Sequence, residues 1–372
     1  MGAQMLFRKY YKALLATAAL LTITSQPASA QYASDVQQQI INNTIQNIIQ
    51  SVRDQVQRRR IVPPGRLQFS GEEGEFNSRD PFAANGMSNP FGALAYAKAP
   101  AMAVAPAQQW LYGANLVSSA DKALSFNTDI HTWTVTGAFD VTKIGIFTAT
   151  DALTFIGTGS QTWSRTNTFP IEFEGSVPST SGTLAYLNGG FSADFTVLAS
   201  WTRNSLTTAP PPPILAIAPP DSSSASYTGN AQYRFDFPYS VWFEPTAGVT
   251  YTEVYTANFG TKIADTTEVH GGGRVGTEMK WMGFTVQPTL SGQVYKIVDA
   301  SFSGLLGPNV PFVAPTFANL GGRGSAKVTV LWTPNFSSYL EGHASGTAGT
   351  QTSAFNSATQ IYGAQAGLRY TW

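Results

Sequence analysis

Residues 362–372 read YGAQAGLRYTW, and their side chains alternate between an apolar or aromatic set and a small or polar set. Successive side chains of an extended chain face opposite directions, so one face of this segment is apolar and the other is hydrophilic. The chain ends on Trp372, which belongs to the apolar face. A strand of a soluble protein gains nothing from a terminal exposed aromatic. The pattern therefore predicts a β-strand that separates lipid from water.

The N-terminus has the features of a secretory signal. A basic start is followed by an apolar stretch, ALLATAALLTI at residues 13–23, and then by the small-x-small motif Ala28-Ser29-Ala30. The apolar stretch has the length of a signal-peptide core, whereas an uncleaved membrane anchor, the alternative interpretation, needs about 20 apolar residues. We predict that residues 1–30 are a signal peptide and that Gln31 is the mature N-terminus.

Composition supports a membrane protein built from strands. Charged residues make up only 12% of the chain, aromatic residues another 12%, and no later segment is apolar over the length that a spanning helix needs. The chain contains no cysteine, which excludes disulfides, thiolate nucleophiles and cysteine-ligated metals. Its formal net charge is zero, so nothing indicates a nucleic-acid partner.

Two regions separate the signal from the strands. Residues 31–62 carry apolar side chains at three- and four-residue spacing, which predicts an amphipathic helix that ends before Pro63-Pro64-Gly65. Residues 63–107 are rich in Gly, Pro and Ala without periodicity, and we interpret them as a linker. The helix stripe consists of Val36, Ile40, Ile41, Ile45, Ile48, Ile49, Val52 and Val56.

Residues 108–372 have the pattern of strands throughout. In the segment Val241–Tyr251, Phe243 and Val249 fall on the lipid face and Glu244 falls on the opposite face. We predict an all-β fold, a transmembrane antiparallel β-barrel of about twelve strands, with the short helical segment before it. Alternation is weaker between residues 126 and 163, where the turn is placed only between residues 140 and 151.

Short and long connections alternate along this region. Pro238-Tyr239 and Pro334-Asn335 mark short connections, whereas Asn204–Ala225 and Asp299–Gly322 are long and rich in Gly, Pro and Ser. Transmembrane barrels have short periplasmic turns and long outward loops, so both ends of the predicted barrel lie in the periplasm. A soluble β-protein, the alternative, would not explain why so many aromatic residues share one face.

Three stretches resemble the translocator β-domain of autotransporters, the barrels of type V secretion. They are YRFDFPYSVWFEPTAGVTYTEV at residues 233–254, AYLNGGFSADF at residues 185–195 and GGGRVGTEMKWMGFTVQPTLSGQVYK at residues 271–296. The resemblance covers residues 110–372. It implies twelve strands in the bacterial outer membrane, around a pore through which a passenger is exported and which a helix then often occupies.

The resemblance also implies partners during biogenesis and one departure from the family. The Sec translocon, periplasmic chaperones and the barrel-assembly machinery would handle the chain, the last reading a C-terminal signal at Leu368, Tyr370 and Trp372, and outer-membrane lipid would surround the barrel. Residues 31–107 are too few for a passenger of ordinary size and contain no β-solenoid repeat. We therefore expect a vestigial passenger, which the barrel anchors or translocates.

Seven titratable side chains fall on the predicted lumen face of three consecutive strands. Both signs of charge are present, and a mixed cluster in a small barrel more often neutralises itself or holds a helix than selects ions. These lumen candidates are Arg234, Asp236, Glu244, His270, Arg274, Glu278 and Lys280.

Other functions are open at this point: a porin-like diffusion channel, a structural outer-membrane protein, or an enzyme or adhesin carried on the loops. His131, His270 and His343 fall on separate predicted strands or strand ends, and no hydrolase or zinc motif is present, so we predict no enzyme activity, no catalytic residue and no metal or cofactor. The eight tryptophans recur near strand ends, which favours aromatic girdles at the membrane interfaces over a carbohydrate-binding surface.

Overall fold

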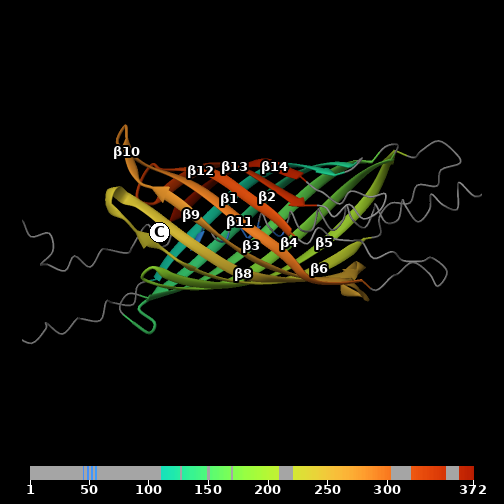
Figure 1. Cartoon of the computed structure of the whole chain (residues 1–372), viewed down its shortest axis with the longest axis horizontal. Helices are drawn as coiled ribbons and strands as arrows, with labels where there is room; N and C mark the ends of the chain where they lie inside the picture. Colours follow the sequence, from blue (N-terminus) through green and yellow to red (C-terminus); the bar gives the residue numbers. More distant parts are fainter. Residues whose placement is uncertain are drawn as a thin grey trace, which may run out of the picture.

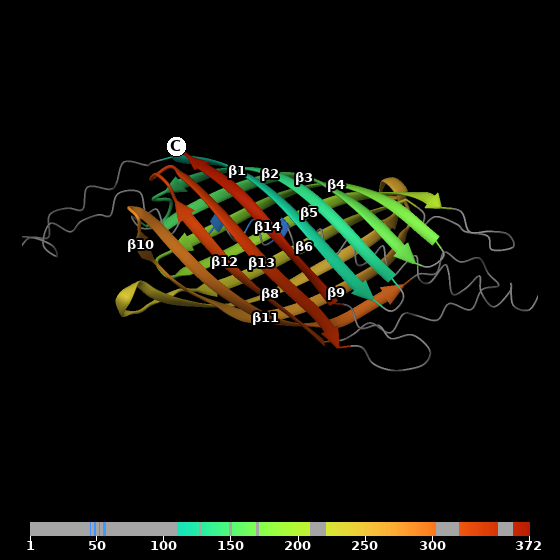
Figure 2. The ribbon, with the colours of Figure 1, turned by 90° about the horizontal axis from the view of Figure 1, so that it is seen from above.

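The computed structural model is a closed antiparallel β-barrel (Figures 1 and 2). It describes residues 110–125, 128–148, 151–168, 171–208, 221–302, 320–348 and 360–372, together with the six positions 45, 48, 49, 52, 55 and 56. The predicted signal peptide with its predicted cleavage residues Ala28, Ala30 and Gln31, the remainder of residues 31–62, and the predicted linker 63–107 lie outside the described residues.

Twelve long strands form the wall, as the sequence predicts. Each pairs with the next along the chain, and β14 pairs with β1 to close the barrel. The short strands β7 (Phe235–Asp236) and β10 (Met279–Trp281) extend two of the hairpins. The long strands are β1 (Trp110–Ser125), β2 (Thr128–Ile144), β3 (Asp151–Thr168), β4 (Ile171–Asn188), β5 (Phe191–Thr208), β6 (Ser222–Tyr233), β8 (Val241–Thr256), β9 (Lys262–Thr277), β11 (Phe284–Phe302), β12 (Leu320–Leu331), β13 (Phe336–Ala348) and β14 (Gln360–Thr371).

The strand register fixes the tilt of the barrel. Following the paired residues from Trp110 once around the wall leads back to β1 at Leu124, so the register advances by 14 residues per circuit. For twelve strands this offset corresponds to a tilt of about 40° and a backbone diameter of about 24 Å. The strands in Figure 1 cross the long axis obliquely, as this tilt requires.

The two faces of each strand differ as the alternation predicts. On β14, Leu368 and Tyr370 are about half exposed on the outer face, whereas Gln365 and Arg369 are buried on the lumen face. The same division holds on β8, where Phe243 and Val249 point outward and Glu244 inward. Large apolar side chains stay exposed on the outside because lipid, rather than protein, covers that face.

The two ends of the barrel are built differently. We call the inner end the one that holds Trp110 and Trp372, whose neighbourhood is fixed by the backbone bonds between Tyr112 and Trp372. Five connections reach it, including the 3-10 turn η2 (Pro238–Ser240) and the turn at residues 145–150, within the range predicted from the sequence. The outer end carries the longest connections, which join β5 to β6, β11 to β12 and β13 to β14, and the 3-10 turn η3 (Ala257–Phe259).

Most tryptophans lie at these two ends on the outer face. Trp110, Trp332 and Trp372 are exposed near the inner end, and Trp133 and Trp163 stack on each other toward the outer end with ring centroids 5.0 Å apart. Trp242 is different: its side chain is 5% exposed and faces the lumen, where it lies over Gly276. The girdle interpretation is therefore wrong for Trp242. Within the described residues, no helix is long and apolar enough to cross a membrane.

Candidate functional site: the barrel lumen

Six described positions of residues 31–62 lie inside the barrel. They are assigned as helical, and their side chains are at most 4% exposed. Ile45, Ile48, Ile49, Val52 and Val56 form one apolar cluster with the lumen wall, and their segments are visible between the walls in Figure 2. The wall residues of this cluster come from β3, β4, β5, β8 and β9: Ile156, Ala185, Leu187, Leu198, Val254 and Ala264.

One half of the lumen wall, β2 to β8, is lined by hydroxyl side chains that bond to each other between neighbouring strands. The Thr134 and Thr162 hydroxyls are 2.9 Å apart, and Thr228 and Thr250 are 3.1 Å apart. We call β2 to β8 the hydroxyl half. Each such pair lets one hydroxyl donate to the other within the wall, so these side chains present an uncharged surface beside the apolar stripe. Further pairs are Thr142–Thr154, Thr158–Ser181, Thr183–Thr196, Ser200–Ser224 and Ser226–Thr252.

The other half, β9 to β14 together with β1, is lined by ionisable side chains, and we call it the ionic half. The guanidinium of Arg323 donates to Glu268 at 2.7 Å and to Gln293 at 2.5 Å. His343 contacts Asp121 at 2.5 Å. In the described strands, all lumen-facing Lys and Arg side chains lie on this half: Arg274, Arg323, Lys327 and Arg369.

Two buried ion pairs join the halves where they meet. Arg274 on β9 donates to Glu244 on β8 at 2.5 Å, and Glu244 is completely buried. Arg369 on β14 donates to Asp140 on β2 at 2.9 Å, across β1, and Asp140 is also completely buried. In a water-poor interior such pairs hold both side chains in one arrangement, because an unpaired charge there is costly.

Glycines permit contacts that pass over an intervening strand. His270 on β9 hydrogen-bonds to Asn230 on β6 at 2.8 Å, although β8 lies between them. Gly248 occupies the crossing point on β8, where a Cβ atom would lie 2.4 Å from the Asn230 Oδ1 atom and 2.5 Å from the His270 Nε2 atom. The missing side chain therefore makes this contact possible.

The structure divides the seven lumen candidates into two groups. Glu244, His270 and Arg274 are buried in the lumen wall. The other four lie at the inner end, beyond the places where the long strands stop: Arg234 pairs with the exposed Asp236 at 2.7 Å and lies 4.8 Å from the Trp242 ring, while Glu278 and Lys280 are exposed around β10. Strands β6 and β9 end at Tyr233 and Thr277, so the sequence alternation continues past the barrel wall.

Several ionisable lumen residues were not identified from the sequence, because their partners are far apart along the chain. Asp140 and Arg369 are 229 residues apart, and Asp121 and His343 are 222 residues apart. The parity of each strand identifies these side chains as inward, but the pairing depends on the register offset around the barrel. Among the described residues, no group of three His, Asp or Glu side chains is arranged to hold a metal ion.

This architecture is similar to that of several proteins of known structure. No family model and no curated protein sequence matches the chain. Among solved structures it is similar to the β-domain of the Bordetella autotransporter BrkA, with a TM-score of 0.53 and 16% identity over 70% of this chain and 98% of that one. The fold is that of an autotransporter translocator domain. This is the fold of a bacterial outer-membrane β-barrel.

Two other translocator barrels show more distant likeness. The translocator domain of NalP from Neisseria meningitidis has a TM-score of 0.47 and 9% identity, over 71% of this chain and 88% of that one. The transport unit of AIDA-I from Escherichia coli has a TM-score of 0.40 and 12% identity, over 75% of this chain and 95% of that one. These identities are too low to indicate any likeness of the lumen side chains.

Proposed function

We propose that this protein is an autotransporter-type translocator whose vestigial passenger is its own N-terminal segment, and that a helix within residues 31–62 closes the lumen. In this proposal residues 1–30 are a removed signal peptide, residues 63–107 are a linker, and residues 108–372 are the barrel, which the barrel-assembly machinery inserts after reading Leu368, Tyr370 and Trp372. The protein has no enzymatic role.

The observation that supports the proposal is the burial of the five described stripe residues, which pack mainly against the hydroxyl half. Ile48 and Val56 are completely buried, and Ile45, Ile49 and Val52 are nearly so. Removing such side chains from water stabilises the contact by about 1.5–3 kcal/mol each. A matching apolar stripe on the wall would be exposed to water in an open channel, which favours an occupied lumen.

The size of the barrel also supports the proposal. A backbone diameter of about 24 Å leaves about 14 Å after the wall side chains are subtracted. An α-helix with its side chains is about 10–12 Å wide. One helix therefore fits and two do not, so a single copy of the segment fills the lumen.

Conductance in planar bilayers tests the proposal. The mature protein is compared with a version that lacks residues 31–105, both refolded and both showing heat-modifiable migration on gels as proof of a closed barrel. We expect a closed mature form and a conducting truncated form. Equal conductance of the two would overturn the proposal and favour the porin-like diffusion channel.

Crosslinking places the helix directly, because the chain contains no cysteine of its own. Val52→Cys combined with Leu198→Cys joins two members of the lumen cluster, and a disulfide should form in intact outer membranes. The matched control combines Val52→Cys with Leu290→Cys, which is 60% exposed on the lipid face of β11. Free protease access to residues 45–56 in intact membranes would contradict lumen occupancy.

A further inference from the structure

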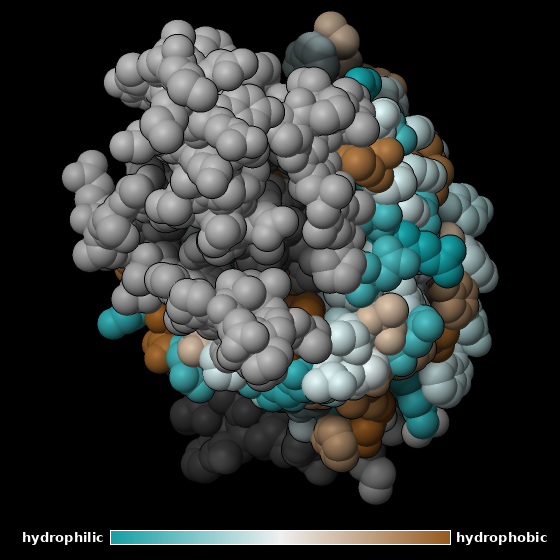
Figure 3. All heavy atoms as spheres, turned by 90° about the vertical axis from the view of Figure 1, so that its right-hand side faces the viewer, coloured by the Kyte–Doolittle hydropathy of each residue, from teal (hydrophilic) through white to brown (hydrophobic). Residues whose placement is uncertain are grey.

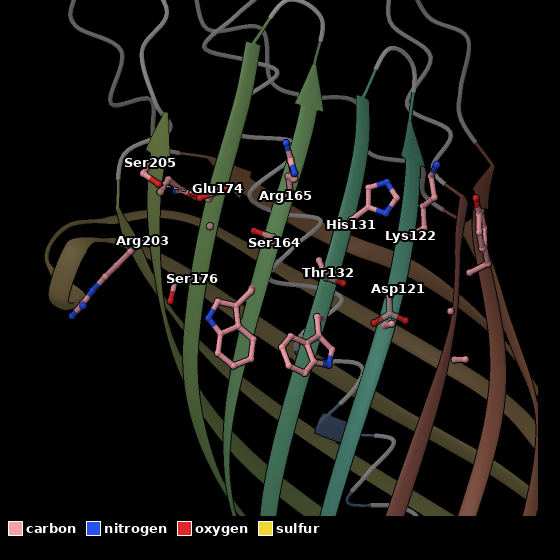
Figure 4. A pocket seen from close by; sticks show the side chains of 18 residues that line it. Asp121, Lys122, His131, Thr132, Ser164, Arg165, Glu174, Ser176, Arg203 and Ser205 are labelled. Atoms are coloured by element: carbon pink, nitrogen blue, oxygen red, sulfur yellow. Dashed lines mark hydrogen bonds between the residues drawn. The ribbon is translucent and has the colours of Figure 1, made fainter. Parts of the chain in front are cut away.

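A depression on the outer face of the barrel has features that the translocator role does not use. It has a volume of about 1000 Å³ and spans β14, β1, β2, β3, β4 and β5 below the outer end (Figure 4). Trp133 and Trp163 stack at its centre, and the small residues Ala120, Ala364 and Ser176 flank them at the same register.

Three cationic or titratable side chains line its upper edge. Lys122, His131 and Arg165 are register partners on the adjacent strands β1, β2 and β3. They lie two residues further toward the outer end than the tryptophan row, and in Figure 4 they point toward that end. Arg203 on β5 also lines the depression. We call Lys122, His131 and Arg165 the rim cluster.

The depth of the rim cluster in the membrane determines which part of the lipid its side chains contact. Stacked tryptophans on the lipid face lie at the level where hydrocarbon changes to headgroups. The rim cluster lies just beyond them, and so faces the headgroups of the outer leaflet. Seen from the outer end, hydrophilic and hydrophobic side chains both lie on the visible outside of the barrel (Figure 3).

Two of the three acidic neighbours lie on the water side of the rim cluster. Asp129 accepts from Lys122 at 2.9 Å and lies 3.8 Å from His131, and it is two residues nearer the outer end on β2. Glu172 pairs with the Nε–H of Arg165 and is likewise nearer the outer end on β4. Glu174 is level with Arg165. An anion that approaches from the membrane therefore meets the cations before Asp129 and Glu172.

Donors remain for such an anion. The Lys122 ammonium has three donors, and Asp129 occupies one. Arg165 is 61% exposed and uses its Nε–H for Glu172, and within the described residues its terminal amino groups make no hydrogen bond. A guanidinium fork next to an ammonium matches the oxygens of a phosphate group, which forms short charge-assisted hydrogen bonds with both.

We propose that this depression binds one phosphorylated acyl-disaccharide lipid of the outer leaflet. The rim cluster holds a phosphate of its headgroup, the Trp133–Trp163 pair packs against the sugar, and an acyl chain follows the small residues Ala120 and Ala364 toward the membrane centre. The site is independent of whether the lumen is open or closed.

Native mass spectrometry of the mature protein, released from a neutral detergent, tests the proposal. The probe is diphosphoryl lipid A, and the variant Lys122→Gln/Arg165→Gln is compared with the unchanged protein. We expect at least a tenfold weaker apparent affinity in the variant. The control Lys143→Gln/Lys262→Gln removes two other cations that lie over aromatic rings, 5.5 Å from Trp110 and 5.6 Å from Tyr251, and should bind as the unchanged protein does.

Further probes distinguish the sources of phosphate. Dephosphorylated lipid A and phosphatidylglycerol should each bind at least tenfold more weakly than diphosphoryl lipid A, and millimolar inorganic phosphate should not displace it. Equal binding of phosphatidylglycerol would indicate a general anionic belt and overturn the proposal, as would equal loss in the control. Heat-modifiable migration shows that each variant is folded, and Arg165→Lys, which keeps the charge but loses the fork, is the milder second variant, expected to bind three- to tenfold more weakly.

Discussion

The two halves of the lumen wall provide partners for their buried polar side chains in different ways. Strands β2 to β8 are lined by Ser and Thr pairs such as Thr134–Thr162, which satisfy each other between neighbouring strands. Strands β9 to β14 and β1 are lined by charged side chains whose partners lie across a strand, as with Arg323 and Glu268. A wall lined mainly by uncharged hydroxyls accepts an apolar helix, whereas ions beneath such a helix are costly unless each has a partner. The buried N-terminal stripe accordingly lies on the hydroxyl half and its edge.

The difference also shows where the wall is most sensitive to substitution. Hydroxyl pairs are local and numerous, so each contributes little. Ionic pairs are few and buried, and removal of one partner leaves the other without its counter-charge. The boundaries between the halves, held by Arg274–Glu244 and Arg369–Asp140, combine burial with charge. Four substitutions rank these contributions.

The largest effect is expected at the boundary between β14 and β2. Arg369→Met leaves the completely buried Asp140 without the guanidinium 2.9 Å away, and should lower the free energy of unfolding by about 3–5 kcal/mol. Urea unfolding in detergent, followed by tryptophan fluorescence, measures this. Adding Asp140→Leu should restore more than half of the loss. If single and double variants unfold alike, the pair is not what holds this boundary.

A smaller effect is expected in the apolar stripe of the hydroxyl half. Leu198→Ala removes a side chain that is 2% exposed in the lumen cluster, and should weaken helix docking by about 2–3 kcal/mol. The readout is the open fraction in single-channel recordings, which should rise. Leu290→Ala on the lipid face is the control and should leave the open fraction unchanged. A closed channel in both variants would argue that the stripe does not retain the helix.

The third effect in size is expected at Gly248 on β8, over which the contact between Asn230 and His270 passes. Gly248→Ala inserts a Cβ atom between Asn230 and His270, and should destabilise the barrel by about 1–3 kcal/mol through overpacking. Gly137→Ala on β2 is matched, because nothing lies within 4 Å of its added Cβ atom. The two variants are compared by thermal loss of heat-modifiable migration. Equal melting would mean that the wall relaxes around Gly248 at no cost.

The smallest effect is expected for one hydroxyl pair. Thr228→Ala removes one partner of a 3.1 Å contact and should cost about 0.5–1.5 kcal/mol. The double variant with Thr250→Ala should cost less than the sum of the two single changes, in a double-mutant cycle by urea unfolding. A coupling of zero would show that this pair adds nothing to the hydroxyl half.

The sequence predicts the barrel well because the pattern that indicates a barrel strand lies within each strand. Alternation in residues 362–372 and 241–251 indicates which side chains face lipid, and connection lengths indicate which end is which. It predicts the lumen cluster less well. Arg234 and Glu278 continue the alternation of β6 and β9 but lie past the ends of these strands. Contacts such as Asp140–Arg369 depend on how the first and last strands are aligned, which no local pattern contains.

Because the barrel is closed with a register offset of 14 residues, the effect of an insertion in a strand depends on whether the number of added residues is odd or even. One residue added inside a long strand without a compensating bulge would exchange its lipid and lumen faces from that point to the next turn, placing ions in hydrocarbon. Two added residues would keep the faces but displace every hydrogen-bonded neighbour around the closed circuit. Additions are absorbed chiefly in the long connections at the outer end, or as a local bulge like the one between Ile297 and Asp299 on β11. The connections at the outer end can therefore change while the length of each strand stays fixed.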